Sequence, residues 1–360
     1  MKVTIVGGGN VGTQFAVHFA EKGNDVYIRT SKPDKFDRTL KIVDHNNNVI
    51  HSAKIVKATA SNEEAFKDAD LIFITVPSFA MKTVAKQVMP YLKCGSMVGI
   101  IPGNGGGELA FKDALAKGAI IFGMQRVPSV ARLVKYGEVV RATGYRSKLY
   151  VASLPNKYTT KIKELISTTF DMSCGELPNY LDLTLTPSNP ILHTTRLYTL
   201  FNDYVPGKTY ERIPLFYEEW DNKTTELLFK CDAEVQNLCK ELKDFDLRGV
   251  KSLKIHYEND TLNGFTHKIQ TIEGFKGLPT PTIKKGTRFI PNLRSRYFTA
   301  DFNFGLNIFI QMSKMYGVKM PNCQRIIDWY NNIKDPTFSE FNFADYGINN
   351  REEFENFYKN

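Results

Sequence analysis

The sequence predicts two domains: an N-terminal α/β domain with a doubly wound parallel sheet over residues 1–182, and an all-α domain over residues 183–360. Apolar runs typical of buried strands alternate with helical periods in the first half. From about Leu181 onward the pattern changes to long helical periods that are rich in aromatic residues and broken by prolines. A chain of 360 residues is also longer than one ordinary core requires. We expect the boundary between Pro178 and Pro187.

A glycine-rich motif follows directly on the first predicted strand. The apolar residues 3–6 run into G-G-G-N-V-G at residues 7–12, which fits G-x-G-x-x-G, and a helical stretch and a second strand at residues 25–28 follow. Gly7 suits the tight turn, Gly9 lets a pyrophosphate approach the backbone, and Gly12 allows close helix packing. A strand, turn, helix and strand in this order indicate a Rossmann unit that binds a dinucleotide at the helix N-terminus. The cofactor contacts predicted in this motif are Gly7, Gly9, Asn10, Val11 and Gly12.

The end of the second strand indicates which dinucleotide is bound. NAD-binding units carry an acidic residue there that accepts a hydrogen bond from the ribose 2′-hydroxyl. Here the sequence reads I-R-T-S-K at residues 28–32, so Arg29, Ser31 and Lys32 offer positive charge and a hydroxyl instead. A 2′-phosphate would bind such a set of donors. We therefore expect NADP, with NAD as the alternative. If no ligand binds here, Arg29 and Lys32 are ordinary surface cations in contact with solvent.

Two further segments are expected at the same edge of the sheet, where ligands bind in open α/β folds. Val76 and Pro77 end the apolar strand of residues 71–76, and a glycine-rich loop at residues 102–108 follows the strand of residues 97–101. Within that loop we expect Asn104 to lie near the nicotinamide, although the loop could also be only a flexible crossing. Residues 40–43 and 49–50 are expected to form a small hairpin inserted in the sheet, and residues 119–123 and 148–152 the remaining strands.

Composition and charge restrict the function. The net charge of +9 comes from basic residues that are scattered among acidic ones, and the sequence contains no zinc-finger or RNA-binding motif. A dinucleotide and carboxylate substrates explain this surplus more simply than a nucleic acid does. No apolar run approaches the length of a membrane span, and the first strand begins at residue 2, so we expect a cytoplasmic protein that binds no membrane. Five dispersed cysteines without a C-x-x-C pair predict free thiols, and the absence of H-E-x-x-H predicts no metal.

Two polar segments stand out in the second half of the chain. The first, N-P-I-L-H at residues 189–193, places Asn189 as a helix cap, Pro190 in the first helical position and His193 in the first turn. The second, R-Y-F-T-A-D-F-N-F-G-L, spans residues 296–306. At these residues the chain resembles the opine dehydrogenase family, the NAD(P)-dependent octopine and nopaline dehydrogenase type. The sequence departs from the family pattern at Ala300, where the family has Glu, and at Thr194, where Pro is common.

The resemblance implies a Rossmann domain joined to a helical domain, and an enzyme that condenses an amino acid with a 2-oxo acid and reduces the imine. It implies that His193 moves protons, that Asp301 orients and stabilises its imidazolium, and that Arg296 holds a substrate carboxylate. Each residue also has an alternative role that involves no catalysis. His193 could be a histidine on the helix surface or in the core, Asp301 could cap a helix N-terminus, and Arg296 could form a surface ion pair. The amino acid cannot be named from the sequence, and whether the chain forms a homodimer is left open.

Two other functions compete with this one. A ketone reductase of the 2-dehydropantoate reductase or glycerol-3-phosphate dehydrogenase type shares the two-domain plan, but such enzymes use a Lys near the start of the second domain, and residues 181–205 contain none. A binding protein that senses NADP without catalysis is the second, and Ala300 in place of an acid favours it.

Overall fold

The computed structural model describes residues 1–359, and the chain divides into two compact units. The first unit contains Met1–Thr184 and the last residues from Tyr358 onward, and the second contains Leu185–Phe357. Each unit is described by itself below. Among the described residues no helix is long and apolar enough to cross a membrane.

An eight-stranded sheet forms the centre of the first unit, in the order β12-β11-β8-β7-β6-β1-β2-β5. The six strands from β8 to β5 are parallel, whereas β11 pairs with β8 in the antiparallel direction. The inner strands are apolar along their whole length because helices cover both faces. The strands are β1 (Lys2–Val6), β2 (Asp25–Arg29), β5 (Lys57–Thr59), β6 (Leu71–Ile74), β7 (Met97–Ile100), β8 (Ile120–Met124), β11 (Lys148–Leu154) and β12 (Ser173–Glu176).

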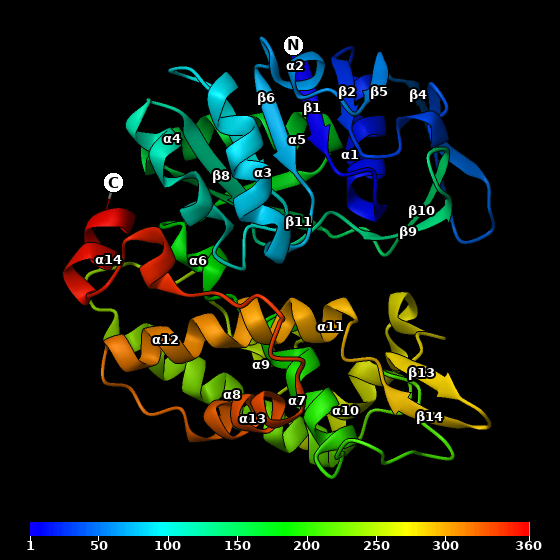
Figure 1. Cartoon of the computed structure of the whole chain (residues 1–360), viewed down its shortest axis with the longest axis vertical. Coiled ribbons are helices and arrows are strands. Elements are labelled where there is room, and N and C mark those ends of the chain that lie inside the picture. The colour runs from blue at the N-terminus through cyan, green and yellow to red at the C-terminus, as the bar shows by residue number, and fades with distance from the viewer. Residues whose placement is uncertain (360) are drawn as a thin grey trace. The chain divides into compact units, whose positions relative to one another are not determined.

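Helices lie on both faces of this sheet, as Figure 1 shows with α3 in front and α5 behind. On the face of the sheet that α1 and α5 cover, Phe15 of α1 packs edge-on against two other rings. The distances between ring centroids are 5.1 Å to Phe73 of β6 and 4.9 Å to Phe170 of α5. Helix α2 begins at a cap in which the Ser61 side chain accepts a hydrogen bond from the Glu64 amide. The helices are α1 (Asn10–Glu21), α2 (Asn62–Phe66), α3 (Met81–Val88), α4 (Lys112–Ala116), α5 (Thr159–Phe170) and α6 (Leu181–Thr184).

A second sheet of four strands was not expected from the sequence. The hairpin predicted near residues 40–50 exists, but it pairs through β3 with β10 and so belongs to this separate sheet rather than to the large one. The segment around Arg132, for which the sequence predicts no strand, forms β9. The prediction failed because these strands are short and the pairing of β10 with β3 joins segments far apart in the sequence, which local spacing does not reveal. The strands are β3 (Thr39–Val43), β4 (Val49–Lys54), β9 (Val130–Lys135) and β10 (Val139–Thr143), in the order β4-β3-β10-β9.

The second unit is helical apart from one hairpin, β13 (Thr282–Lys285) with β14 (Arg288–Pro291). Its first helix is capped by Ser188, so Asn189 is the first helical residue and not the cap that the sequence suggested. A π-helix at Asp301–Leu306 runs directly into α12. The α-helices are α7 (Asn189–Phe201), α8 (Asn222–Glu241), α9 (Leu253–His256), α10 (Leu262–Thr271), α11 (Arg296–Thr299), α12 (Asn307–Met315), α13 (Pro321–Ile333) and α14 (Arg351–Tyr358). The predicted fold class, a Rossmann domain followed by a helical domain, is confirmed.

A buried carboxyl group joins three segments of the first unit. Glu108, fully buried, accepts hydrogen bonds from the Thr184 hydroxyl at 2.8 Å and the Tyr358 hydroxyl at 2.6 Å. Burial raises the pKa of Glu108, while these two hydrogen bonds act in the opposite direction. The glycine-rich loop that leads to Glu108 is therefore fastened to the end of α6 and to the C-terminal tyrosine.

Candidate active site

The glycine-rich motif has an open side and a packed side. A Cβ on Gly9 would meet no atom within 4 Å, whereas a Cβ on Gly12 would lie 1.8 Å from the Gly7 carbonyl oxygen. Gly7 itself has a φ of +104°, which favours glycine. Helix α1 carries no acidic residue in its first turn, so its N-terminus offers an unopposed site for an anion. These features fit a dinucleotide whose pyrophosphate lies over Gly9.

Asn10 serves the loop in a way that the motif did not predict. Its side-chain oxygen accepts a hydrogen bond from the Leu133 amide at 2.8 Å, which fastens the start of α1 to β9. The neighbouring Val11 packs against the core of the first unit. The side chains of both residues thus support the loop, and their backbone remains the part suited to phosphate.

The three residues predicted to recognise a 2′-phosphate are Arg29, the last residue of β2, and Ser31 and Lys32, which lie just after it. Arg29 is half-buried, and its Nε donates to the Asn62 side-chain oxygen at 2.7 Å. Ser31 and Lys32 are exposed. The Lys32 amide donates to the Thr30 hydroxyl at 3.3 Å, which turns the chain directly after the strand. The structure therefore brings two cations and a hydroxyl together at the position where the sequence contains no carboxylate.

The remaining predicted cofactor residues follow β6 and β7. Val76 lies against the glycine-rich motif, since a Cβ on Gly7 would come within 3.2 Å of its Cγ1 atom, and half-buried Pro77 is the next residue. Asn104 is half-buried in the loop after β7. That loop is packed rather than loose: a Cβ on Gly103 would lie 2.7 Å from Leu183 and 3.0 Å from Gly123.

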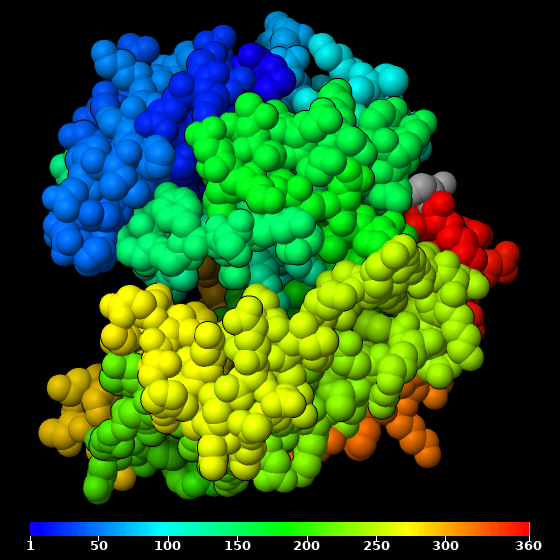
Figure 2. All heavy atoms as spheres, turned by 180° about the vertical axis from the view of Figure 1, so that it is seen from behind, coloured from blue at the N-terminus to red at the C-terminus, as the bar shows by residue number. Residues whose placement is uncertain are grey.

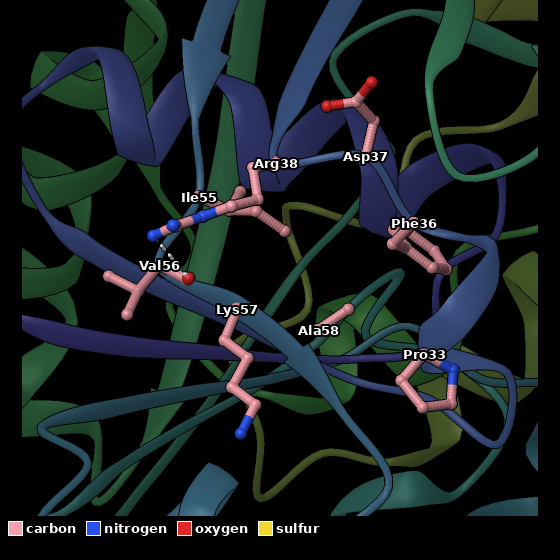
Figure 3. A pocket seen from close by; sticks show the side chains of 8 residues that line it. All are labelled: Pro33, Phe36, Asp37, Arg38, Ile55, Val56, Lys57 and Ala58. Atoms are coloured by element: carbon pink, nitrogen blue, oxygen red, sulfur yellow. Dashed lines mark hydrogen bonds between the residues drawn. The ribbon is translucent and has the colours of Figure 1, made fainter.

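A pocket of about 390 Å³ lies on the first unit beside the edge strand β5 (Figure 3). Its wall includes Phe36, Arg38 and Lys57, and the Arg38 guanidinium donates to the Val56 carbonyl at 3.3 Å. None of the residues predicted to bind the cofactor lines it. The pocket nevertheless adjoins the glycine-rich motif, since a Cβ on Gly8 would lie 2.2 Å from the ring of Phe36, which lines it.

In the second unit, the structure brings His193 and Asp301 together although 108 positions separate them in the sequence. His193 Nδ1 and Asp301 Oδ2 are 2.7 Å apart, and only 9% of the histidine side chain and 16% of the aspartate side chain are exposed. A carboxylate can only accept a hydrogen bond, so Nδ1 carries the proton and donates it. Asp301 thereby fixes the tautomer of the ring.

The other imidazole nitrogen has a partner that the sequence analysis did not assign. His193 Nε2 lies 2.7 Å from the Tyr217 hydroxyl. Since Nδ1 bears the proton, Nε2 of the neutral ring accepts from that hydroxyl. Tyr217 is buried, and its ring stacks on Phe275 with 4.1 Å between centroids. No sequence signal indicates this role, because an aromatic residue among other aromatic residues more often fills a core.

Arg196 holds the segment that carries Tyr217. It lies one turn after His193 on α7 and is fully buried. Its guanidinium donates to the carbonyls of Leu215, Phe216 and Glu219 and to the side chain of Asp221. Burial lowers the pKa of Arg196, and Asp221 opposes that effect. One buried arginine thus fixes the backbone on both sides of Tyr217.

The π-helix places Asp301 beside α7. Asp301 is its first residue, and π-helical turns occur often at functional sites. A Cβ on Gly305 would lie 2.8 Å from the Pro190 ring, so only glycine lets this turn approach the start of α7 so closely. The glycine of the second polar segment and the proline of the first are therefore parts of one packing contact.

Arg296 is the first residue of α11, the short helix that precedes the π-helix, and its side chain is exposed. Within the described chain, no hydrogen bond or ion pair occupies its guanidinium, so it is available to bind a carboxylate. Tyr297, the next residue, places its ring 4.4 Å from that of His193. The predicted roles of His193, Asp301 and Arg296 remain predictions.

Comparison with known proteins relates each part of the chain to a family of NAD(P)-dependent dehydrogenases. Residues 176–334 match the family described as NAD/NADP octopine/nopaline dehydrogenase, alpha-helical domain, and residues 2–103 match the NAD-dependent glycerol-3-phosphate dehydrogenase N-terminus. Tauropine dehydrogenase of Arabella iricolor is 26% identical over 91% of this chain and 90% of its own length. Octopine dehydrogenase of Pecten maximus is 25% identical over 91% and 89%. Over residues 176–334 the chain thus matches the octopine/nopaline dehydrogenase family, and over most of its length it is similar to opine dehydrogenases.

Solved structures agree with this fold. Octopine dehydrogenase with NADH and L-arginine matches with a TM-score of 0.82 and 21% identity over 97% of this chain and 96% of that one. Yersinopine dehydrogenase with NADP⁺ matches with a TM-score of 0.65 and 14% identity over 92% and 90%. These similarities show that the chain is an NAD(P)-dependent oxidoreductase that acts on CH–NH donors.

Proposed function

We propose that the chain is an NAD(P)H-dependent opine dehydrogenase that condenses the amine of an amino acid with a 2-oxo acid such as pyruvate. The product is a secondary amine with two carboxylates. Related proteins named tauropine and octopine dehydrogenase, and octopine dehydrogenase structures described with pyruvate and with L-arginine, support this substrate class. The observation that carries the proposal is the buried series Asp301, His193 and Tyr217, joined by two contacts of 2.7 Å.

The chemistry assigns a task to each group. The bound nicotinamide supplies the hydride. Formation of the imine requires that the carbonyl oxygen leave as water, and a protonated His193 can donate the proton through Nε2. The Asp301 carboxylate orients the ring and stabilises the imidazolium cation that holds this proton before it is transferred. Arg296 can hold a substrate carboxylate with two parallel hydrogen bonds.

We further propose that the enzyme prefers NADPH. Arg29 and Lys32 supply charge, and Ser31 supplies a hydroxyl, where an NAD-binding unit would have an acid. The proposal is a preference only, since the solved relatives include one described with NADH and another with NADP⁺.

Steady-state oxidation of NADPH with pyruvate and a panel of amino acids tests the function. Oxidation that depends on the amino acid supports an opine dehydrogenase. Oxidation with the 2-oxo acid alone would instead identify a ketone reductase, and NADPH binding without turnover would identify a sensor. His193→Ala is expected to lower turnover by about 10² or more while cofactor affinity stays nearly unchanged, because proton transfer contributes that much.

A further inference from the structure

A second group of ionisable side chains lies in the first unit, away from the glycine-rich motif. His18 and Glu21 are one turn apart on the last part of α1, and His51 lies on β4 of the small sheet. One ring nitrogen of each histidine and one carboxylate oxygen of Glu21 all lie within 4.8 Å of one another. We call these three residues the His18 cluster.

His18 is buried, but one of its ring nitrogens has no hydrogen-bond partner among the described residues. Only 4% of the residue is exposed, and its Nε2 is buried without a hydrogen-bond partner. A buried polar atom without a partner is unfavourable and indicates that something else binds there. Its ring lies between those of His51 and Phe170, at 4.6 and 4.9 Å between centroids.

The other two members are already oriented toward each other. His51 Nδ1 lies 2.9 Å from Glu21 Oε2, and the second carboxylate oxygen accepts from the Ser52 amide at 2.9 Å. Roughly a third of each of the two side chains is exposed, so both can adjust and an ion can enter from solvent. The nearby cation, Lys22, is paired with Asp171 at 2.7 Å and so opposes a bound cation less than a free lysine would.

We propose that the His18 cluster binds a divalent transition-metal ion, with Zn²⁺ the best fit to two imidazoles and a carboxylate. Such ligands bind zinc at about 2.0–2.2 Å, and a water molecule completes the fourth position. Small rotations of the His51 and Glu21 side chains bring the donor atoms from their present spacing to that of a tetrahedral site. The ion links the end of the dinucleotide-binding helix α1 to β4, on a face where Figure 2 shows the blue N-terminal segments beside the green segment of α5.

The absence of an H-E-x-x-H motif predicts no metal, in contrast to the site proposed here. A site that combines a helix with a strand some thirty residues later has no such signature. The i, i+3 spacing of His18 and Glu21 on one helix face is the local part that could have been noticed.

Tag-free, chelator-treated full-length protein is titrated with Co²⁺, followed by visible absorption, and with Zn²⁺, followed by calorimetry and by the melting temperature. We expect one ion per chain, a Co²⁺ spectrum typical of a four-coordinate nitrogen and oxygen site, and a higher melting temperature with Zn²⁺. His51→Ala and Glu21→Gln are expected to weaken binding at least tenfold. The matched control is His45→Ala, which removes an exposed histidine from the turn between β3 and β4.

Two results would overturn the proposal. The first is the absence of stoichiometric binding by the wild-type protein. The second is binding that His51→Ala leaves unchanged, or that His45→Ala weakens to the same extent, because the ion would then occupy another site. His51 lies at the surface of the unit, so its replacement tests the site even if His18 variants do not fold.

Discussion

Replacing Asp301 by Asn tests whether the carboxylate supports proton transfer by His193. The amide has nearly the same shape, so the substitution removes the charge and leaves the packing intact. The lost interaction is a 2.7 Å hydrogen bond between groups that are 9% and 16% exposed. A hydrogen bond to a charged group contributes about 1.5–3 kcal/mol, and each 1.36 kcal/mol changes a rate tenfold. We therefore expect kcat to fall about 10- to 150-fold.

The assay is amino-acid-dependent NADPH oxidation at saturating substrate, with cofactor affinity measured separately by fluorescence titration. Cofactor affinity should stay within about twofold, because Asp301 belongs to the helical unit and the predicted dinucleotide contacts belong to the other. Asp328→Asn is the control, since it removes an exposed carboxylate from the same unit. A kcat within twofold of wild type in a folded variant, or an equal loss in Asp328→Asn, would refute the reasoning.

Three other predictions concern separate parts of the chain. Tyr217→Phe removes the hydroxyl partner of His193 Nε2 and should lower kcat about tenfold with little change in NADPH affinity; unchanged kcat would leave Tyr217 a packing residue. Arg29→Ala should weaken NADPH binding about tenfold and leave NADH binding nearly constant in parallel calorimetric titrations, and equal losses for both would argue against a 2′-phosphate contact. Burial raises the pKa of Asp232 to about 6, so the stability that its protonated form provides is present below about pH 4 and is lost as the pH rises through 6. Asp232→Asn should therefore gain about 3 kcal/mol relative to wild type between pH 4 and pH 7.5 in urea unfolding, and a pH-independent difference would contradict this.

The sequence was most informative where local spacing carries the function. The glycine-rich motif predicted the dinucleotide-binding element, because each glycine has a separate steric reason to be there. The strand β6 was recognisable because a strand covered on both faces is apolar throughout. The small sheet was missed in part because β9 is an exposed strand whose charged residues resemble a loop.

The active-site cluster was predictable only in part. His193 and Asp301 could be paired through the resemblance to a known family, although neither residue indicates the other by spacing. Tyr217 and Arg196 could not be found in this way, since a buried tyrosine and a buried arginine acquire their roles from tertiary packing. The contact between Gly305 and Pro190 likewise exists only once the π-helix and α7 lie together.

The link between Glu108 and Tyr358 bears on how the protein is handled in the laboratory. Tyr358 stands two residues before the end of the chain, yet its hydroxyl supports a buried acid that follows the glycine-rich loop of the nucleotide-binding half. Trimming a few residues from that end would deprive Glu108 of its shortest hydrogen bond. A variant that lacks Tyr358 and binds the cofactor weakly would therefore point to this lost support rather than to damaged chemistry.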